Sequence, residues 1–199
     1  MKRKLKITYT LLILICAVLG YSQTLIPGKT IRTSADISLT SAANKARDFL
    51  VLLDMTPGIV DSYKGQLGKR YGFPGRRLWN ITTPSAWVHL DSQSGIITSF
   101  VDHKRLDDRY RGRNRTGKKF TTVEATAKAH LRAIATKLGV SANTQLTGYK
   151  MVGDGIGQDS NPMGYFGCVF KNSAGEVVAT LSCDIQDGAL LEYSRSRDR

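Results

Sequence analysis

The sequence predicts an α+β fold made of two tandem repeats, each a helix packed on a three- or four-stranded antiparallel sheet. Three observations support this fold class. Two segments space their apolar residues as helices do, two hairpins alternate apolar and polar residues, and one five-residue turn pattern occurs twice, 93 positions apart. With 199 residues, the chain is long enough for one ordinary domain or two small ones.

Both helical segments carry an apolar stripe. In the second half, residues 121–124 read Thr-Thr-Val-Glu and fit a capping box, and Gly139 is a typical C-terminal stop. Between them the stripe consists of Ala127, Leu131, Ile134 and Leu138. In the first half, Thr40 opens a segment in which the same places are taken by Ala46, Leu50 and Leu53. We therefore expect one helix in each repeat.

Each predicted helix is followed by a hairpin whose apolar residues fall on one face. In the second repeat, a turn at 172–175 and pairing of Lys171 with Glu176 would give the apolar pairs Phe170–Val177, Cys168–Ala179 and Phe166–Leu181. In the first repeat, a turn at 82–85 would give the pairs Ile81–Ala86 and Trp79–Val88. Residues 145–153 are expected to add a strand to the second repeat.

A tight turn follows each hairpin and leads into another strand. Residues 91–95 and 184–188 share the pattern Asp-x-Gln-x-Gly. The Asp side chain can bond the turn backbone, and Gly can take a positive φ, so this chemistry predicts a structural turn.

The formal charge of +13 is unevenly distributed. Four positive charges precede an uncharged stretch whose apolar part is nine residues long, too short to span a bilayer. Residues 1–22 are therefore predicted to be a signal peptide cleaved before Gln23, and the alternative is an uncleaved N-terminal anchor. Of the remaining +9, segment 103–119 contributes +6 and segment 64–77 contributes +5, so the rest carries −2. The predicted organisation is an N-terminal extension at 23–37, a first repeat at 38–102, a basic linker at 103–119 and a second repeat at 120–199.

The helix, the hairpin and the Asp-x-x-x-Gly turn resemble PepSY-like modules, which have a cystatin-like topology. The tandem arrangement resembles repeats of the YcdB type, and the resemblance covers about residues 38–101 and 120–194. It implies a non-catalytic part of an exported bacterial protein, linked to protease propeptides, inhibition or envelope binding. No catalytic residue carries over from such modules.

Candidate site residues fall in two groups. Trp87 and His89 alternate with apolar residues, so they point to the other sheet face, where they bind a partner or pack one repeat against the other. In the linker, arginines suited to phosphates or anionic lipid headgroups alternate with other residues at Arg109, Arg111, Arg113 and Arg115.

Other reactive residues receive structural interpretations. Cys168 and Cys183 are expected to be core-packed thiols, because the predicted register puts them four positions apart, too far for a disulfide. His130 is expected to pack beside a helix, and no nucleophile motif accompanies His103 or Asp102. The glycine-rich segment 153–162 departs from phosphate and calcium motifs, so it is expected to be a loop.

The sequence therefore predicts an exported, non-catalytic binding or protease-inhibitory module of the bacterial envelope, without cofactor or metal. The alternative is a basic protein that binds a polyanion or a membrane surface through the arginine-rich linker. The expected partner is a protein or an envelope polyanion, and membrane contact would also follow from an uncleaved N-terminus. Nucleic acid is not expected for an exported chain, and a hydrolase has only His89 and His103 in its favour.

Overall fold

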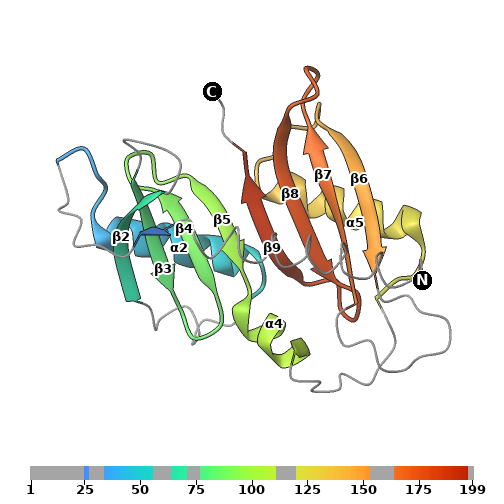
Figure 1. Ribbon diagram of the computed structural model, residues 1–199, viewed down its shortest axis with the longest axis horizontal. Helices are drawn as coiled ribbons and strands as arrows, with labels where there is room; N and C mark the ends of the chain where they lie inside the picture. The colour runs from blue at the N-terminus through green and yellow to red at the C-terminus, as the bar shows by residue number, and fades with distance from the viewer. Residues whose placement is uncertain are drawn as a thin grey trace, which may run out of the picture.

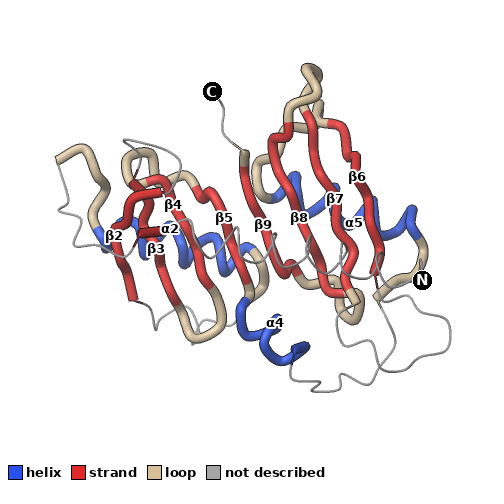
Figure 2. Tube along the Cα trace, in the orientation of Figure 1, coloured by secondary structure: helices blue, strands red, loops and turns tan. Residues whose placement is uncertain are grey.

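A computed structural model describes residues 25–26, 34–55, 64–70, 77–110, 120–152 and 164–196. Two of its helices, α2 (Leu39–Leu52) and α5 (Glu124–Lys137), lie on one side of a single antiparallel sheet, which confirms the α+β class (Figures 1 and 2). The predicted signal peptide lies outside the described residues. No helix within the described ranges is long and apolar enough to cross a membrane.

The sheet joins strands from both halves of the chain in the order β1-β2-β3-β4-β5-β9-β8-β7-β6. In the first half the strands are β1 (Leu25–Ile26), β2 (Lys64–Arg70), β3 (Arg77–Thr82), β4 (Trp87–Asp91) and β5 (Ile97–Val101). In the second half they are β6 (Gln145–Val152), β7 (Tyr165–Lys171), β8 (Val177–Asp184) and β9 (Leu190–Arg195). The expectation of a separate sheet in each half is corrected, because β5 pairs with β9 and makes the sheet continuous.

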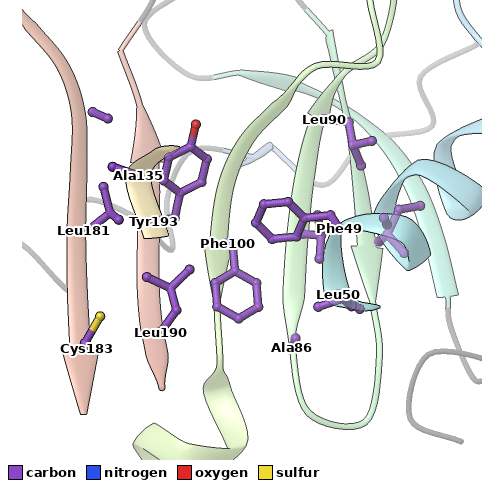
Figure 3. Close-up of a cluster of buried hydrophobic side chains, with 14 of the residues drawn as sticks. Phe49, Leu50, Ala86, Leu90, Phe100, Ala135, Leu181, Cys183, Leu190 and Tyr193 are labelled. Atoms are coloured by element: carbon purple, nitrogen blue, oxygen red, sulfur yellow. The ribbon is translucent and has the colours of Figure 1, made fainter. Parts of the chain in front are cut away.

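One hydrophobic core runs beneath this junction. Phe49 of α2 packs on Phe100 of β5, with ring centroids 5.5 Å apart, and on Tyr193 of β9 at 6.1 Å (Figure 3). Phe100 lies directly opposite Tyr193 in the sheet, and both are almost completely buried. The two halves therefore share both backbone hydrogen bonding and side-chain packing.

The two helices form at the predicted places, but their starts differ. Ser38, not Thr40, caps α2, because its hydroxyl accepts a hydrogen bond from the Ser41 amide at 3.0 Å. The predicted capping box at 121–124 does not form: Thr121 Oγ1 bonds the Val123 amide instead, and α5 begins at Glu124. Gly139 follows α5 with φ +72°, as expected for a C-terminal stop.

Both hairpins form where predicted, but each register is shifted by two residues. Ile81 lies opposite Val88 rather than Ala86. Cys168 lies opposite Leu181 rather than Ala179. Because side chains alternate with a period of two, this shift keeps each of these residues on its predicted face.

The shift arises from side chains that bond the turn backbone. Thr83 Oγ1 accepts hydrogen bonds from the amides of Ser85 and Ala86, at 3.4 and 2.9 Å, so the first turn spans 83–86. In the second turn Asn172 pairs with Glu176, which shifts the register by one residue. A bulge between Phe170 and Lys171 shifts it by one more.

The repeated Asp-x-Gln-x-Gly pattern makes turns, as predicted. Gly95 and Gly188 have φ values of +70° and +74°, and their amides bond the carbonyls of Asp91 and Asp184. The side chain of Asp91 accepts from the amide of Ser94 at 2.8 Å, and that of Asp184 from the amide of Gln186 at 2.9 Å. These residues are explained by turn formation.

The predicted N-terminal extension contributes to the folded body. Asp36 is buried, pairs with Arg77 at 2.7 Å and accepts a hydrogen bond from Ser92 Oγ at 2.6 Å. Ile37 donates its amide hydrogen to the Ser92 carbonyl and accepts from Trp79 Nε1 at 3.0 Å. Further upstream, β1 pairs with β2.

The segment predicted as a basic linker begins as a helix. This helix, α4, spans His103–Tyr110, and the Asp102 carboxylate accepts the Arg105 amide hydrogen at 2.9 Å. The Arg105 guanidinium then lies 2.6 Å from Asp187 in the second half. The first part of the basic segment is thus fixed against both halves, and residues 111–119 lie outside the described residues.

Candidate functional site

The face of the sheet that points away from α2 and α5 is the candidate binding surface. Along β4, Val88 and Leu90 are fully buried in the helix-covered core, whereas Trp87 is 40% exposed and His89 is half-buried on the other side. The prediction that these two residues face away from the core follows from the same alternation.

Two rows of side chains cross this face, and we refer to both rows together as the open face. Strand pairing aligns the first row, which consists of Asn80, His89, Ser99, Ser194, Thr180, Val169 and Thr147. The second row consists of Thr82, Trp87, Val101, Glu192, Ser182, Gly167 and Lys150. Both rows pass through the β5–β9 pair, so the open face spans the two halves.

Hydroxyl and amide groups dominate the open face, and they bond across strands. The Nδ1 atom of His89 lies 2.7 Å from Ser99 Oγ, and Ser182 Oγ lies 3.5 Å from a Glu192 carboxylate oxygen. Beside His89, the Oδ1 atom of Asn80 is buried and has no hydrogen-bond partner within the described residues. The surface therefore offers neutral hydrogen-bonding groups with few charges.

Trp87 lies next to Thr82, near one end of the second row, and packs on α4. Its ring centroid is 4.9 Å from that of His103, with 31° between the ring planes. His103 is itself held by a hydrogen bond from Nε2 to the Thr83 carbonyl at 3.2 Å. The halves are joined one strand further on, at β5 and β9, so Trp87 does not lie between them. The structure thus gives no support to inter-repeat packing, and partner binding stays a prediction for this residue.

The four arginine candidates are only partly described. Arg109 lies in the last turn of α4. The other three, Arg111, Arg113 and Arg115, are outside the described residues. Their proposed contact with phosphates or lipid headgroups stays a prediction.

The histidines and aspartates singled out by the sequence make structural contacts. His130 Nε2 lies 2.8 Å from the Gly188 carbonyl, and the His130 ring packs on Phe120. The Asp102 carboxylate accepts a hydrogen bond from the backbone amide of Arg105 and lies 3.2 Å from Arg105 Nε. Within the described ranges, no group of three His, Cys, Asp or Glu side chains could hold a metal ion.

Cys168 and Cys183 are free thiols in the core of the second half. The corrected register brings them nearer than predicted, since Cys183 lies opposite Phe166, two residues from Cys168. Burial raises the pKa of the Cys168 thiol from 9.0 to about 12, with the nearby Arg132 charge opposing the shift. Burial, reinforced by the neighbouring Cys168 thiol, also raises the pKa of Cys183. Both side chains are therefore protonated and unreactive at neutral pH.

The free energy of unfolding is expected to fall as the pH rises above about 9. An unfolded thiol titrates near 9, whereas folded Cys168 keeps its proton up to about 12. The folded state thus binds more protons between these values and loses stability there, by about 1.4 kcal/mol per pH unit for each thiol. Urea unfolding at pH 8, 9 and 10 should show a loss of stability that steepens toward this slope as the unfolded thiols ionise, and Cys168→Ala should reduce it. Equal slopes in both proteins, or thiols alkylated as fast in the folded chain as in urea, would contradict this explanation.

Together these features define the class of protein: an α+β module with helices on one face of an antiparallel sheet and a polar surface on the other. A solved structure with a similar fold is the Bacillus megaterium YpeB C-terminal domain. The TM-score is 0.50 at 14% sequence identity, over 82% of this chain and 69% of that chain. YpeB contains PepSY modules, so the predicted PepSY resemblance is confirmed at the level of the fold. The chain matches no family in sequence, and no curated protein matches it.

Sequence reasoning missed several residues of this region. Ser99 and Ser194 join the two halves of the open face, but their pairing depends on the long-range contact between β5 and β9. For Arg105, the sequence predicts a place in the basic linker but not its ion pairs with aspartates. The signal that could have identified it is Asp102, which stands three residues before it, at the spacing of a helix cap.

Proposed function

We propose that the protein is an exported, non-catalytic binding module of the bacterial envelope and that it binds a protein partner through the open face. The observation that carries the proposal is the continuity of the two polar rows across both halves of one sheet. Export rests on the predicted signal peptide, and the fold shared with the YpeB C-terminal domain is consistent with it.

The composition of the open face suits recognition of another chain. Interfaces combine hydrogen-bonding groups with a few large aromatic side chains, and charged residues are depleted at their centres. Here Trp87 supplies an exposed aromatic ring, while Ser99, Thr180 and Ser194 supply neutral donors and acceptors. Inhibition of a peptidase is one form that such binding would take.

The proposal predicts that a large charged side chain on the open face abolishes partner binding. Thr180 is half-buried in the first row, so Thr180→Arg should block contact there while leaving the core unchanged. Envelope extract would be passed over immobilised wild-type and variant chains, and the recovered proteins quantified. A partner of the open face should fall at least tenfold with Thr180→Arg.

Ala133→Arg is the matched control, because Ala133 is exposed on α5, on the opposite side of the sheet. It should leave recovery unchanged. Recovery of the same partners by all three chains would exclude the open face as the binding surface. An assay of envelope peptidases with and without the wild-type chain would then separate inhibition from binding alone.

We also propose that the two halves are copies of one unit, as the repeated turns suggest. Each half has one 14-residue helix, and both helices pack on the same face of the sheet. The pairing of Phe100 with Tyr193 supports the duplication, because these residues are separated by the same 93 positions as the turns. Copies related in this way would meet around a pseudo-two-fold axis through that pair.

The alternative function is binding of a polyanion or a membrane surface through the arginine-rich linker. It is favoured by the position of α4, which fixes the start of the basic segment beside the exposed ring of Trp87.

A further inference from the structure

We propose that α4 holds the exposed ring of Trp87 in one orientation on the open face and that His103 is the positioning residue through which it does so. This role rests on the open-face binding proposed above, because it affects binding only if Trp87 contacts the partner. The helix itself lies outside the two polar rows, at the lower end of the sheet below β5 and β9 (Figure 1).

The strands that flank Trp87 cannot by themselves fix its ring. Its cross-strand neighbours on the open face are Thr82 on β3 and Val101 on β5, and both side chains are short. Along β4, the next residue on this face is His89, which is engaged with Ser99 at 2.7 Å. An indole that is 40% exposed beside such neighbours would have more than one rotamer open to it.

His103, the first residue of α4, supplies a ring contact that the strands lack. The centroids of the His103 and Trp87 rings are 4.9 Å apart, within the range of aromatic pairs that attract each other. His103 is itself held by the hydrogen bond from Nε2 to the Thr83 carbonyl at 3.2 Å, and the Lys104 amide bonds the Ser85 carbonyl at 3.1 Å. The start of α4 is therefore attached to the β3–β4 turn, directly beside Trp87.

The second half of the chain holds α4 from the other side. The Arg105 guanidinium lies 2.6 Å from the Asp187 carboxylate in the β8–β9 turn and 3.2 Å from that of Asp102. The Asp102 amide in turn bonds the Leu191 carbonyl of β9 at 2.8 Å. Because α4 is attached to both halves, the orientation of Trp87 in the first half depends on contacts with the second.

An aromatic ring that is held in this way is ordered before a partner arrives. Binding immobilises side chains at an interface, and ordering one of them beforehand improves the affinity by about two- to tenfold. Tryptophan is also one of the residues that most often dominate the energy of an interface. The helix α4 therefore acts on the open-face residue from which we expect the largest contribution to binding.

The mobility of the Trp87 indole tests this role without a partner. In a ¹⁵N-labelled chain of residues 23–199, each tryptophan gives one indole N–H resonance, and Trp87→Phe identifies that of Trp87. Its order parameter should be about 0.85, the value of a rigid group, and should fall below about 0.6 in His103→Ala. His103→Phe keeps an aromatic ring and should restore most of the loss. Trp79 is the internal standard, because its indole is buried and bonded to the Ile37 carbonyl.

Two further variants separate the stacking contact from the helix. Arg105→Met should also loosen Trp87, although its ion pairs are with aspartates, because it releases α4 from the second half. Lys104→Ala is the matched control, since the Lys104 side chain is exposed on the same helix and its backbone bond to Ser85 is kept. A Trp87 indole as rigid in His103→Ala as in the wild type would overturn the proposal. An equal loosening by Lys104→Ala would also overturn it, because the effect would not be specific to His103.

The recovery of partners from envelope extract completes the test. For proteins that are lost with Thr180→Arg, recovery with His103→Ala should fall about two- to tenfold, and His103→Phe should restore it. Unchanged recovery with a mobile Trp87 would overturn the positioning role and leave the open face as the binding surface. If Thr180→Arg removes no protein, open-face binding itself is overturned, and the positioning role with it, whatever the order parameter of Trp87.

Discussion

Removal of residues 103–199 is expected to abolish cooperative folding of the remaining first half. The truncation deletes β9, exposing the edge of β5 and uncovering the Phe49 and Phe100 rings that pack with Tyr193. Burial of a phenylalanine side chain contributes roughly 2–3 kcal/mol, which is a large share of the stability of so small a domain. Urea unfolding of the fragment 23–102, followed by circular dichroism, should show no sigmoidal transition, and its unpaired β5 edge should promote association.

A change at the junction of the full chain provides the matched test. Tyr193→Ala opens a cavity beneath the β5–β9 pair and should lower the free energy of unfolding by about 3 kcal/mol or more. Val177→Ala removes a side chain that is 40% exposed and should change it by less than about 0.5 kcal/mol. A fragment 23–102 that unfolds cooperatively would show instead that each half is an independent domain.

Local sequence chemistry predicted the elements of each half. The helices, hairpins and turns depend on neighbouring residues, such as the apolar stripe of α5 and the Asp-x-Gln-x-Gly turns. The predicted registers are wrong by two because the composition of a turn does not fix its position, whereas the hydrogen bonds of Thr83 and Asn172 do. The shift preserved the faces, so the outward placement of Trp87 and His89 was still predicted correctly.

The contacts between the halves could not be predicted in this way. Nothing in the sequences of β5 and β9 identifies each as the partner of the other, because strand pairing over 90 residues leaves no local pattern. The helix α4 was also missed, since its residues are mostly charged and offer no clear apolar stripe. Both the continuous open face and the position of α4 depend on these long-range contacts.

Replacement of Arg105 is expected to destabilise the protein more than loss of a surface ion pair would. Arg105 contacts three aspartates: Asp102 at 3.2 Å, Asp187 at 2.6 Å and Asp184 at 3.9 Å. The Asp184 side chain is almost completely buried, and that of Asp102 nearly so. Arg105→Met would remove this cation from carboxylates that lie in a poorly hydrated place. We expect the free energy of unfolding to fall by about 2 kcal/mol, less than for a fully buried pair, because Arg105 is partly exposed.

Lys128→Met is the matched control, since it also removes one cation from an ion pair. Lys128 pairs with Glu124 one turn earlier on α5, but both side chains are well exposed, so the loss should be below about 0.5 kcal/mol. A double-mutant cycle with Asp184→Asn tests the mechanism, because this substitution keeps the oxygen that accepts from Gln186. If the cost of Arg105→Met comes from losing the attraction between Arg105 and the Asp184 charge, it should be smaller in the Asp184→Asn background. An equal cost in both backgrounds would assign the effect of Arg105 to packing of α4 rather than to the charge of Asp184.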